Sequence, residues 1–167
     1  MGEMHERPGV EKDGSHDSTQ GKRVEEQSVA RRTMTGWTLG IETTAHTLSF
    51  GLVDKDGIPY PASSDTLRPD QGGIHPREAA DHHKDVAADL FTSVLDQHGL
   101  TTEDIAAVAY SQGPGLGPCL RVGAAVARGL ATRMDVPLIG VNHCVAHIEI
   151  GRQQCGCDDP VLLYVSG

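Results

Sequence analysis

The sequence predicts an α/β domain built on a mixed β-sheet flanked by helices. Three strand-like segments come first and are separated by short turns, so they are expected to pair as antiparallel hairpins. Helical and strand-like segments then alternate, which is typical of parallel strands joined by crossover helices. Between the two groups lies the segment with the clearest helical periodicity in the chain.

The three early strands are bounded by turn residues. Residues 37–42 (WTLGIE) and 47–53 read as strands on either side of a hydroxyl-rich turn. The second strand runs into Asp-Lys-Asp-Gly at 54–57, which is a hairpin turn signal. A third strand is expected within 58–66.

A long amphipathic helix is predicted over 77–98. Its apolar residues recur about every 3.5 residues, as on one face of a helix. They are Ala79, Ala80, Val86, Ala87, Leu90, Phe91, Val94 and Leu95. Pro76 precedes the helix, where its missing N–H costs little, and Gly99 follows it as a terminator.

The second half of the chain continues the alternation. A short buried strand is expected at 105–110, and a glycine-rich loop at 113–118 leads into a helix over 119–134. Asn142 is well suited to cap the helix that follows, because its side chain can accept hydrogen bonds from the first free N–H groups. After the helix over 119–134 we expect a strand at 136–141, then a helix that ends near 153, and then a strand at 161–165.

The first 33 residues differ in composition from the rest. They show no periodic apolar pattern, so residues 1–33 are predicted to be disordered or a non-native extension, and 34–167 to form the folded domain. The same residues lack the apolar core of a secretory signal. No segment approaches the ~18–20 consecutive apolar residues of a membrane span, which favours a cytoplasmic protein without a membrane partner. The net charge of −9 argues against a broad nucleic-acid footprint on these residues.

The first candidate site is the pair His143 and His147 on the last predicted helix. Their i, i+4 spacing puts both imidazoles on one helix face, about 5–6 Å apart between Cβ atoms, so they could share one metal ion. Two histidines that make ordinary hydrogen bonds are the alternative. A zinc protease would need Glu after the first His, where this chain has Cys144.

Two further segments are weaker signals when taken alone. The glycine-rich stretch 113–123 could cradle an anion at a helix N-terminus, or it could be a tight strand–helix turn. Residues 39–52 place Glu42 at a strand end before the turn Thr43 to His46, where backbone and hydroxyl groups could wrap a phosphate. His75, His82 and His83, near the start of the long helix, are expected to be solvated or packed rather than to bind metal.

Four segments together resemble one family. Residues 42–46, 72–78, 113–123 and 142–149 occur in the order and spacing of the tRNA N6-adenosine threonylcarbamoyltransferases, which include bacterial TsaD and the catalytic subunit of the KEOPS complex. The amino-acid sequences at 40–47 and 142–149 are similar to those of the archaeal members of this family. The resemblance covers about 37–167.

The resemblance implies one lobe of an actin-like ATPase fold (sugar kinase/ribonuclease H-like), truncated before a second lobe. It implies one divalent iron or zinc ion held by His143, His147 and Tyr164. It also implies contacts to threonylcarbamoyl-adenylate or ATP. The residues expected to make these contacts are Thr43, Thr44, His46, Tyr164, Val165, Ser166 and Gly167. Glu42 is expected to be catalytic, as a base or an orienting group, or else to be a structural acid that caps the turn.

The activity implied is acyl transfer to N6 of adenosine 37 in tRNAs that read ANN codons. The partners implied are tRNA, a small dimerising KEOPS subunit and a kinase-like subunit, and these residues alone are expected to be inactive. The alternatives are a non-catalytic scaffold like the TsaB paralogue, an actin-like ATPase and a metalloprotease. Bound metal distinguishes the transferase from the scaffold and the ATPase.

Overall fold

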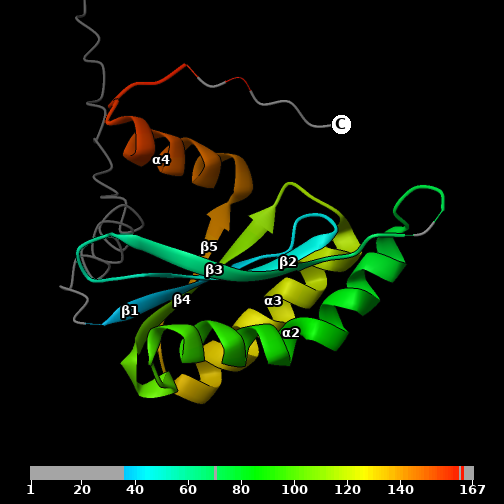
Figure 1. The fold of residues 1–167 in the computed structure, drawn as a ribbon, viewed down its shortest axis with the longest axis horizontal. Coiled ribbons are helices and arrows are strands. Elements are labelled where there is room, and N and C mark those ends of the chain that lie inside the picture. Colours follow the sequence, from blue (N-terminus) through cyan, green and yellow to red (C-terminus); the bar gives the residue numbers. More distant parts are fainter. Residues whose placement is uncertain (1–35, 70, 162, 164–167) are drawn as a thin grey trace, which may run out of the picture. The chain divides into compact units, whose positions relative to one another are not determined.

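The computed structural model describes residues 36–69, 71–161 and 163, which form one sheet with helices on both of its faces (Figure 1). The strands are β1 (Trp37–Glu42), β2 (Thr47–Val53), β3 (Pro59–Thr66), β4 (Ile105–Gly113) and β5 (Leu138–Asn142). The helices are α2 (Pro76–His98), α3 (Gly117–Met134) and α4 (His143–Cys155), with a short 3-10 helix at Thr102–Asp104. The expectation for residues 1–33 lies outside the described residues.

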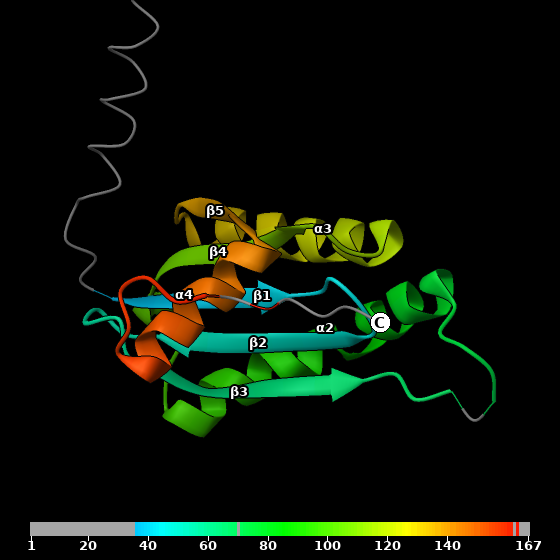
Figure 2. The ribbon, with the colours of Figure 1, turned by 90° about the horizontal axis from the view of Figure 1, so that it is seen from above.

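The sheet is mixed, with strand order β3-β2-β1-β4-β5. β1 and β3 run antiparallel to β2, while β4 is parallel to β1 and β5 is parallel to β4. Helices α2 and α3 lie on one face of the sheet and α4 lies on the other (Figures 1 and 2). The predicted α/β lobe with a mixed sheet flanked by helices is therefore confirmed.

The core lies between the sheet and the α2–α3 layer. Alternate residues of β1 and β2 are buried there, as the period of a strand requires. The fully buried side chains of this layer include Leu39, Leu48, Phe50, Leu52, Val94 and Val108. The opposite face of β1 and β2 carries Gly40 paired with Gly51, so it offers little side-chain volume to α4.

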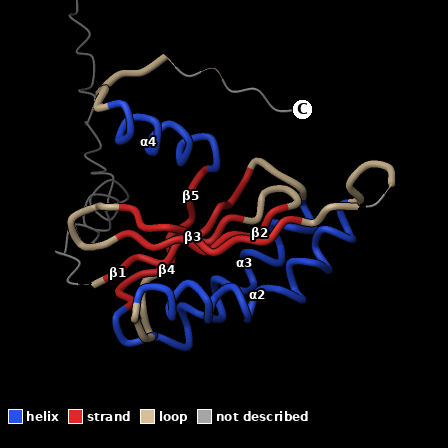
Figure 3. The backbone as a smooth tube through the Cα atoms, in the orientation of Figure 1, coloured by secondary structure: helices blue, strands red, loops and turns tan. Residues whose placement is uncertain are grey.

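Most element bounds agree with the sequence prediction. Helix α2 begins at Pro76 and ends at His98, and Gly99 caps it in the left-handed conformation with φ 64°. Strand β4 is longer than predicted because it extends to Gly113, where it still pairs with Asn142 of β5. Figure 3 shows the strands in red as one layer between α4 and the α2–α3 pair. The strand expected at 161–165 is wrong for the two of its residues that are described. Val161 and Leu163 are outside any strand and fully or largely exposed, since no strand pairs with them.

Candidate metal and substrate site

Three parallel strands bring the site residues to one edge of the sheet. Glu42 is the last residue of β1, Ser111 lies near the end of β4, and His143 follows the last residue of β5. Because carboxyl ends of parallel strands meet at the same edge, residues separated by 101 positions in the sequence become neighbours. This edge is where open α/β sheets usually bind ligands.

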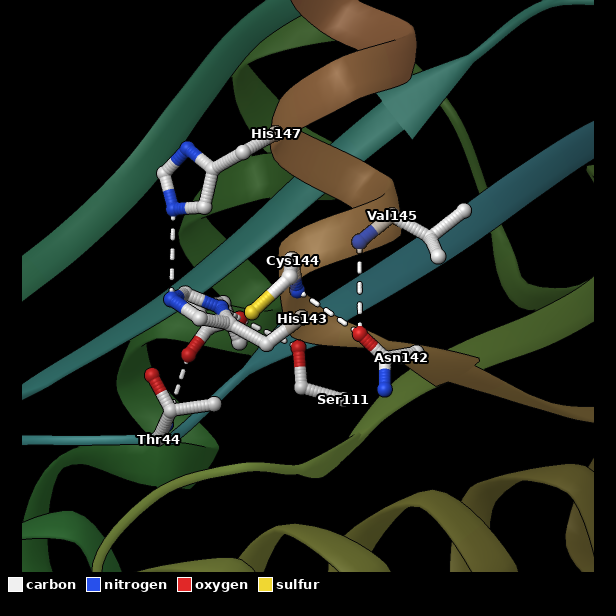
Figure 4. A network of polar contacts seen from close by, with 8 residues as sticks. Thr44, Ser111, Asn142, His143, Cys144, Val145 and His147 are labelled. Atoms are coloured by element: carbon white, nitrogen blue, oxygen red, sulfur yellow. Dashed lines mark hydrogen bonds and ion pairs between the residues drawn. The ribbon is translucent and has the colours of Figure 1, made fainter. Parts of the chain in front are cut away.

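Helix α4 starts at this edge with a well-formed cap. Oδ1 of Asn142 accepts hydrogen bonds from the backbone N–H of Cys144 at 2.9 Å and of Val145 at 3.3 Å (Figure 4). The predicted cap is confirmed. It fixes the first turn of the helix, and therefore the position from which His143 projects.

Glu42 accepts hydrogen bonds on both of its carboxylate oxygens. Oε1 accepts from the backbone N–H of Thr44 at 2.6 Å. Oε2 accepts from the hydroxyl of Ser111 and lies 3.0 Å from Nδ1 of His143. Burial raises the pKa of Glu42, but the hydrogen bonds from Ser111, Thr44 and His143 outweigh it and hold the pKa below its usual value. The group is therefore an ionised acceptor at neutral pH.

The state of Glu42 determines which nitrogen of His143 carries the proton. A carboxylate can only accept, so Nδ1 of His143 must donate, and Nε2 of the neutral ring then carries the lone pair. Nε2 of His147 lies 3.2 Å from Nε2 of His143, and the two rings are nearly perpendicular at 88° (Figure 4). The helix thus turns two ring nitrogens toward one point.

This separation suits a shared metal ion. Two imidazole nitrogens at about 2.0–2.1 Å from a tetrahedral ion would lie about 3.3–3.4 Å apart. The observed 3.2 Å is close to that value. Within 36–69, 71–161 and 163 there is no group of three or more His, Cys, Asp or Glu residues arranged to hold a metal. Among the described residues the pair could therefore offer two ligands to a metal ion and no more. Tyr164, the third predicted ligand, lies outside the described residues.

A cavity of about 480 Å³ lies between α4 and the sheet beside the histidine pair. Its floor includes Gly40 and Gly51, and its walls include Tyr110, His147 and Ile150. A volume of this size is in the range of small-molecule sites. The lining is mainly apolar, with the imidazoles and the carboxylate of Glu42 at one side.

The residues of the turn after Glu42 mostly make contacts within the fold. The backbone carbonyl of Thr44 accepts from Leu116 N–H at 2.7 Å, and Thr44 is 7% exposed. The side chain of Thr43 is 1% exposed and packs against Gly123 of α3. His46 is partly exposed at the end of the turn. The substrate contacts expected from Thr43, Thr44 and His46 stay predictions, as do those from 164–167, which lie outside the described residues.

The other histidines near α2 have structural contacts. Nε2 of His82 pairs with Oδ1 of Asp65 at 2.8 Å, and His83 is fully buried with Nε2 3.0 Å from the carbonyl of Ala45. Nδ1 of His75 accepts from Arg77 N–H at the start of the helix. These contacts are structural ones, and the expectation that the three residues do not bind metal stays a prediction.

Ser111 is the site residue that the sequence prediction missed. It follows an apolar strand and has no motif of its own. The order of the strands could have located Ser111. Because β1, β4 and β5 are parallel, polar residues at their carboxyl ends lie close together. Applying that rule to 105–113 would have placed Ser111 beside Glu42.

Comparison with known proteins identifies relatives with similar amino-acid sequences. A model of the TsaD family, described as tRNA N6-adenosine threonylcarbamoyltransferase, matches residues 60–167. Proteins of that name from Methanococcoides burtonii and Hyperthermus butylicus are 52% and 55% identical over 77% and 78% of this chain. A "Probable bifunctional tRNA threonylcarbamoyladenosine biosynthesis protein" from Methanospirillum hungatei is 57% identical over 79% of this chain and 24% of its own length.

The chain spans 39% and 36% of the lengths of the first two relatives. Among solved structures, YeaZ from Pseudomonas aeruginosa is similar with a TM-score of 0.57 at 18% identity, over 72% of this chain and 50% of that chain. This likeness concerns the fold alone.

Proposed function

The chain belongs to the tRNA N6-adenosine threonylcarbamoyltransferase family, and from that membership we propose that it contributes part of the active site of such an enzyme. The reaction is transfer of the threonylcarbamoyl group from threonylcarbamoyl-adenylate to N6 of adenosine 37 in tRNAs that read ANN codons. The N6 amine attacks the carbamoyl carbonyl carbon, the bond from that carbon to the phosphate oxygen breaks, and AMP leaves. The proton lost by the amine passes to solvent.

The observation that carries this proposal is the pair of facing Nε2 atoms of His143 and His147, 3.2 Å apart, beside a cavity of substrate size. A scaffold without catalysis has no need of such a pair. The sequence relatives at 52–57% identity carry the transferase name or the name of the biosynthesis protein, which favours the enzyme over the scaffold and over an actin-like ATPase.

A divalent iron or zinc ion is the cofactor proposed for this site, with His143 and His147 as ligands. When bound, such an ion acts as a Lewis acid and as a template for anionic oxygens of the donor. In the structure, a hydrogen bond between the two Nε2 atoms needs one proton, carried by His147, because Nε2 of His143 has the lone pair. Ligation requires a lone pair on both Nε2 atoms, so His147 would have to carry its proton on Nδ1 with the ion bound.

The chain's own residues position the site. Asn142 holds the first turn of α4, Glu42 orients His143, and the floor of Gly40 and Gly51 leaves room for a ligand beneath the helix. The lining beside the imidazoles is mainly apolar, and electrostatic interactions are stronger where the surroundings are less polar.

Partner subunits are proposed to bind the face formed by α2 and α3. A groove of about 710 Å³ between these helices is lined by apolar residues that include Ala80, Val122 and Val126. Arg77 and Arg121 also line it, while Lys84 in the same lining pairs with Asp81 at 2.7 Å. This combination suits a small partner that offers apolar residues with acidic ones around them. We assign it to the small dimerising KEOPS subunit. The kinase-like subunit, the tRNA contacts and a cytoplasmic location follow from the family resemblance. Among the described residues, no helix is long and apolar enough to cross a membrane.

The experiment that tests the function compares the complete gene product with its His143→Ala/His147→Ala variant. Metal content and threonylcarbamoyladenosine formation are measured in the same preparations. The proposal predicts about one ion per subunit and modification activity, with both lost in the variant. Activity that persists in a metal-free variant would show that the histidines are structural and would favour the scaffold.

A further inference from the structure

The carboxylate of Glu42 lies behind the metal-binding side of His143, on the nitrogen that faces away from His147. We propose that Glu42, with Ser111, is a positioning residue that fixes the tautomer and ring orientation of His143, and that it takes no proton from the substrate. This inference rests on the proposed function, because it assigns a role within the same site.

The hydrogen bonds around Glu42 occupy three of the about four acceptor sites of its carboxylate. Oε1 receives the backbone N–H of Thr44 at 2.6 Å. Oε2 receives two donors, the hydroxyl of Ser111 and Nδ1–H of His143. A general base must accept a proton from the reacting group within hydrogen-bond reach. Here the carboxylate already accepts three protein donors, and the imidazole of His143 lies between it and His147.

The same contacts match the usual support of a metal-bound histidine. A ligating imidazole commonly donates its second N–H to a carboxylate, which fixes the ring and makes the ligand more basic. Nδ1 of His143 does this at 3.0 Å, with only 15% of the side chain exposed. Ser111 reaches the same carboxylate from β4, so Glu42 is held from two strands.

The variant Glu42→Gln tests whether Glu42 positions His143 or only fills space beside it, because an amide has one accepting oxygen and one donating NH₂ group. The backbone N–H of Thr44 is a fixed donor, so the amide oxygen must face it. The amide NH₂ then faces Ser111 and His143. A hydroxyl can rotate to accept, but Nδ1 of His143 can accept only if its proton moves to Nε2. The nearly isosteric change therefore protonates the nitrogen that should bind metal.

The first measurement is titration of the metal-free complete protein with Co²⁺ and Zn²⁺ alone, followed by absorption and calorimetry. Glu42→Gln should weaken the affinity by about 10–100-fold, the usual effect of losing an outer carboxylate. Ser111→Ala, a milder change, should weaken it less than Glu42→Gln does. Glu149→Gln is the matched control, because it removes the same charge from an exposed position on α4 that pairs with Arg152, and it should bind as the wild type does.

The second measurement reads the tautomer without metal. Long-range ¹H–¹⁵N spectra of the metal-free protein, with His143 assigned through a His143→Gln variant, should show the proton on Nδ1 in the wild type and on Nε2 in Glu42→Gln. Unchanged tautomers in the two proteins, or unchanged metal affinity in Glu42→Gln, would overturn the positioning role.

The two proposals fail separately. If Glu42→Gln keeps wild-type metal affinity and tautomer but loses modification activity, Glu42 acts on the substrate and the proposed function stands. If the wild type binds no metal, the metal site of the proposed function is wrong. The tautomer spectra still decide the role of Glu42 in that case.

Discussion

Nε2 of His83 lies 3.0 Å from the carbonyl oxygen of Ala45, so a fully buried imidazole on helix α2 holds the turn that follows Glu42. Burial lowers the pKa of His83, and the nearby imidazoles of His82 and His46 add to the shift, although the hydrogen bond to Ala45 opposes it. The ring is therefore neutral in the folded protein near neutral pH, and it donates from Nε2.

Stability should depend on pH through this histidine. Between the lowered pKa of the folded state and the ordinary value near ~6.5, the unfolded chain binds a proton that the folded protein does not. The free energy of unfolding should therefore fall as pH drops below about 6.5. Denaturant unfolding at pH 7.5 and 5.5 should show a smaller loss in His83→Gln than in the wild type. An equal loss in both proteins would assign the effect to other groups.

Gly123→Ala should destabilise the fold. A Cβ at this position would lie 3.0 Å from Cβ of Thr43 and even nearer to its hydroxyl, so helix and turn would have to separate. Overpacking of this kind costs about 1–3 kcal/mol, read as a lower midpoint in denaturant unfolding. Gly129→Ala on the same helix has no atom within 4 Å of the new Cβ and should gain about 0.5–1 kcal/mol. Two variants with the same sign of change would refute this prediction.

Thr43→Val tests whether the hydroxyl of Thr43 has a function. Among the described residues this hydroxyl is buried and has no hydrogen-bond partner, so a methyl group should fit as well or better. Unfolding free energy should stay the same or rise by up to about 1 kcal/mol. If the hydroxyl instead binds the donor substrate, as the sequence predicts, Thr43→Val should raise the KM for that substrate. A Ser variant, which restores the hydroxyl, is the control.

Asp104→Asn should weaken the start of the short helix before β4. Oδ2 of Asp104 accepts from both N–H and Oγ1 of Thr101, and these hydrogen bonds hold the pKa of Asp104 below its usual value. Losing these hydrogen bonds should lower the midpoint of denaturant unfolding slightly, because both groups are exposed to water. Because the folded pKa is lowered, the wild-type advantage is present above the ordinary Asp value and should vanish as pH falls below it. Glu103→Gln, the neighbouring change of equal charge, should leave stability nearly unchanged at both pH values.

Local patterns predicted much of this fold. Apolar spacing and the Pro76 and Gly99 boundaries located helix α2, and Asn142 marked the start of α4, because these signals depend on residues close in sequence. Val161 and Leu163 read as a strand from composition alone. A strand also needs a partner to pair with, and composition says nothing about that.

The site was only partly predictable for a similar reason. The i, i+4 spacing of His143 and His147 was visible in the sequence, and the structure does place the two rings together. The hydrogen bond from His143 to Glu42 crosses 101 positions, so no local pattern could show it. The sheet order, which puts β4 between β1 and β5, provides this information.

The placement of Glu42 on the face of β1 opposite the core has a consequence for folding itself. A one-residue slip in the pairing of β1 would turn that carboxylate toward Leu48 and Phe50, away from Ser111 and His143. A charge buried there without partners is strongly destabilising. The polar residues of the site therefore also penalise misregistered sheets, and any selection that keeps these residues would at the same time favour correct strand alignment.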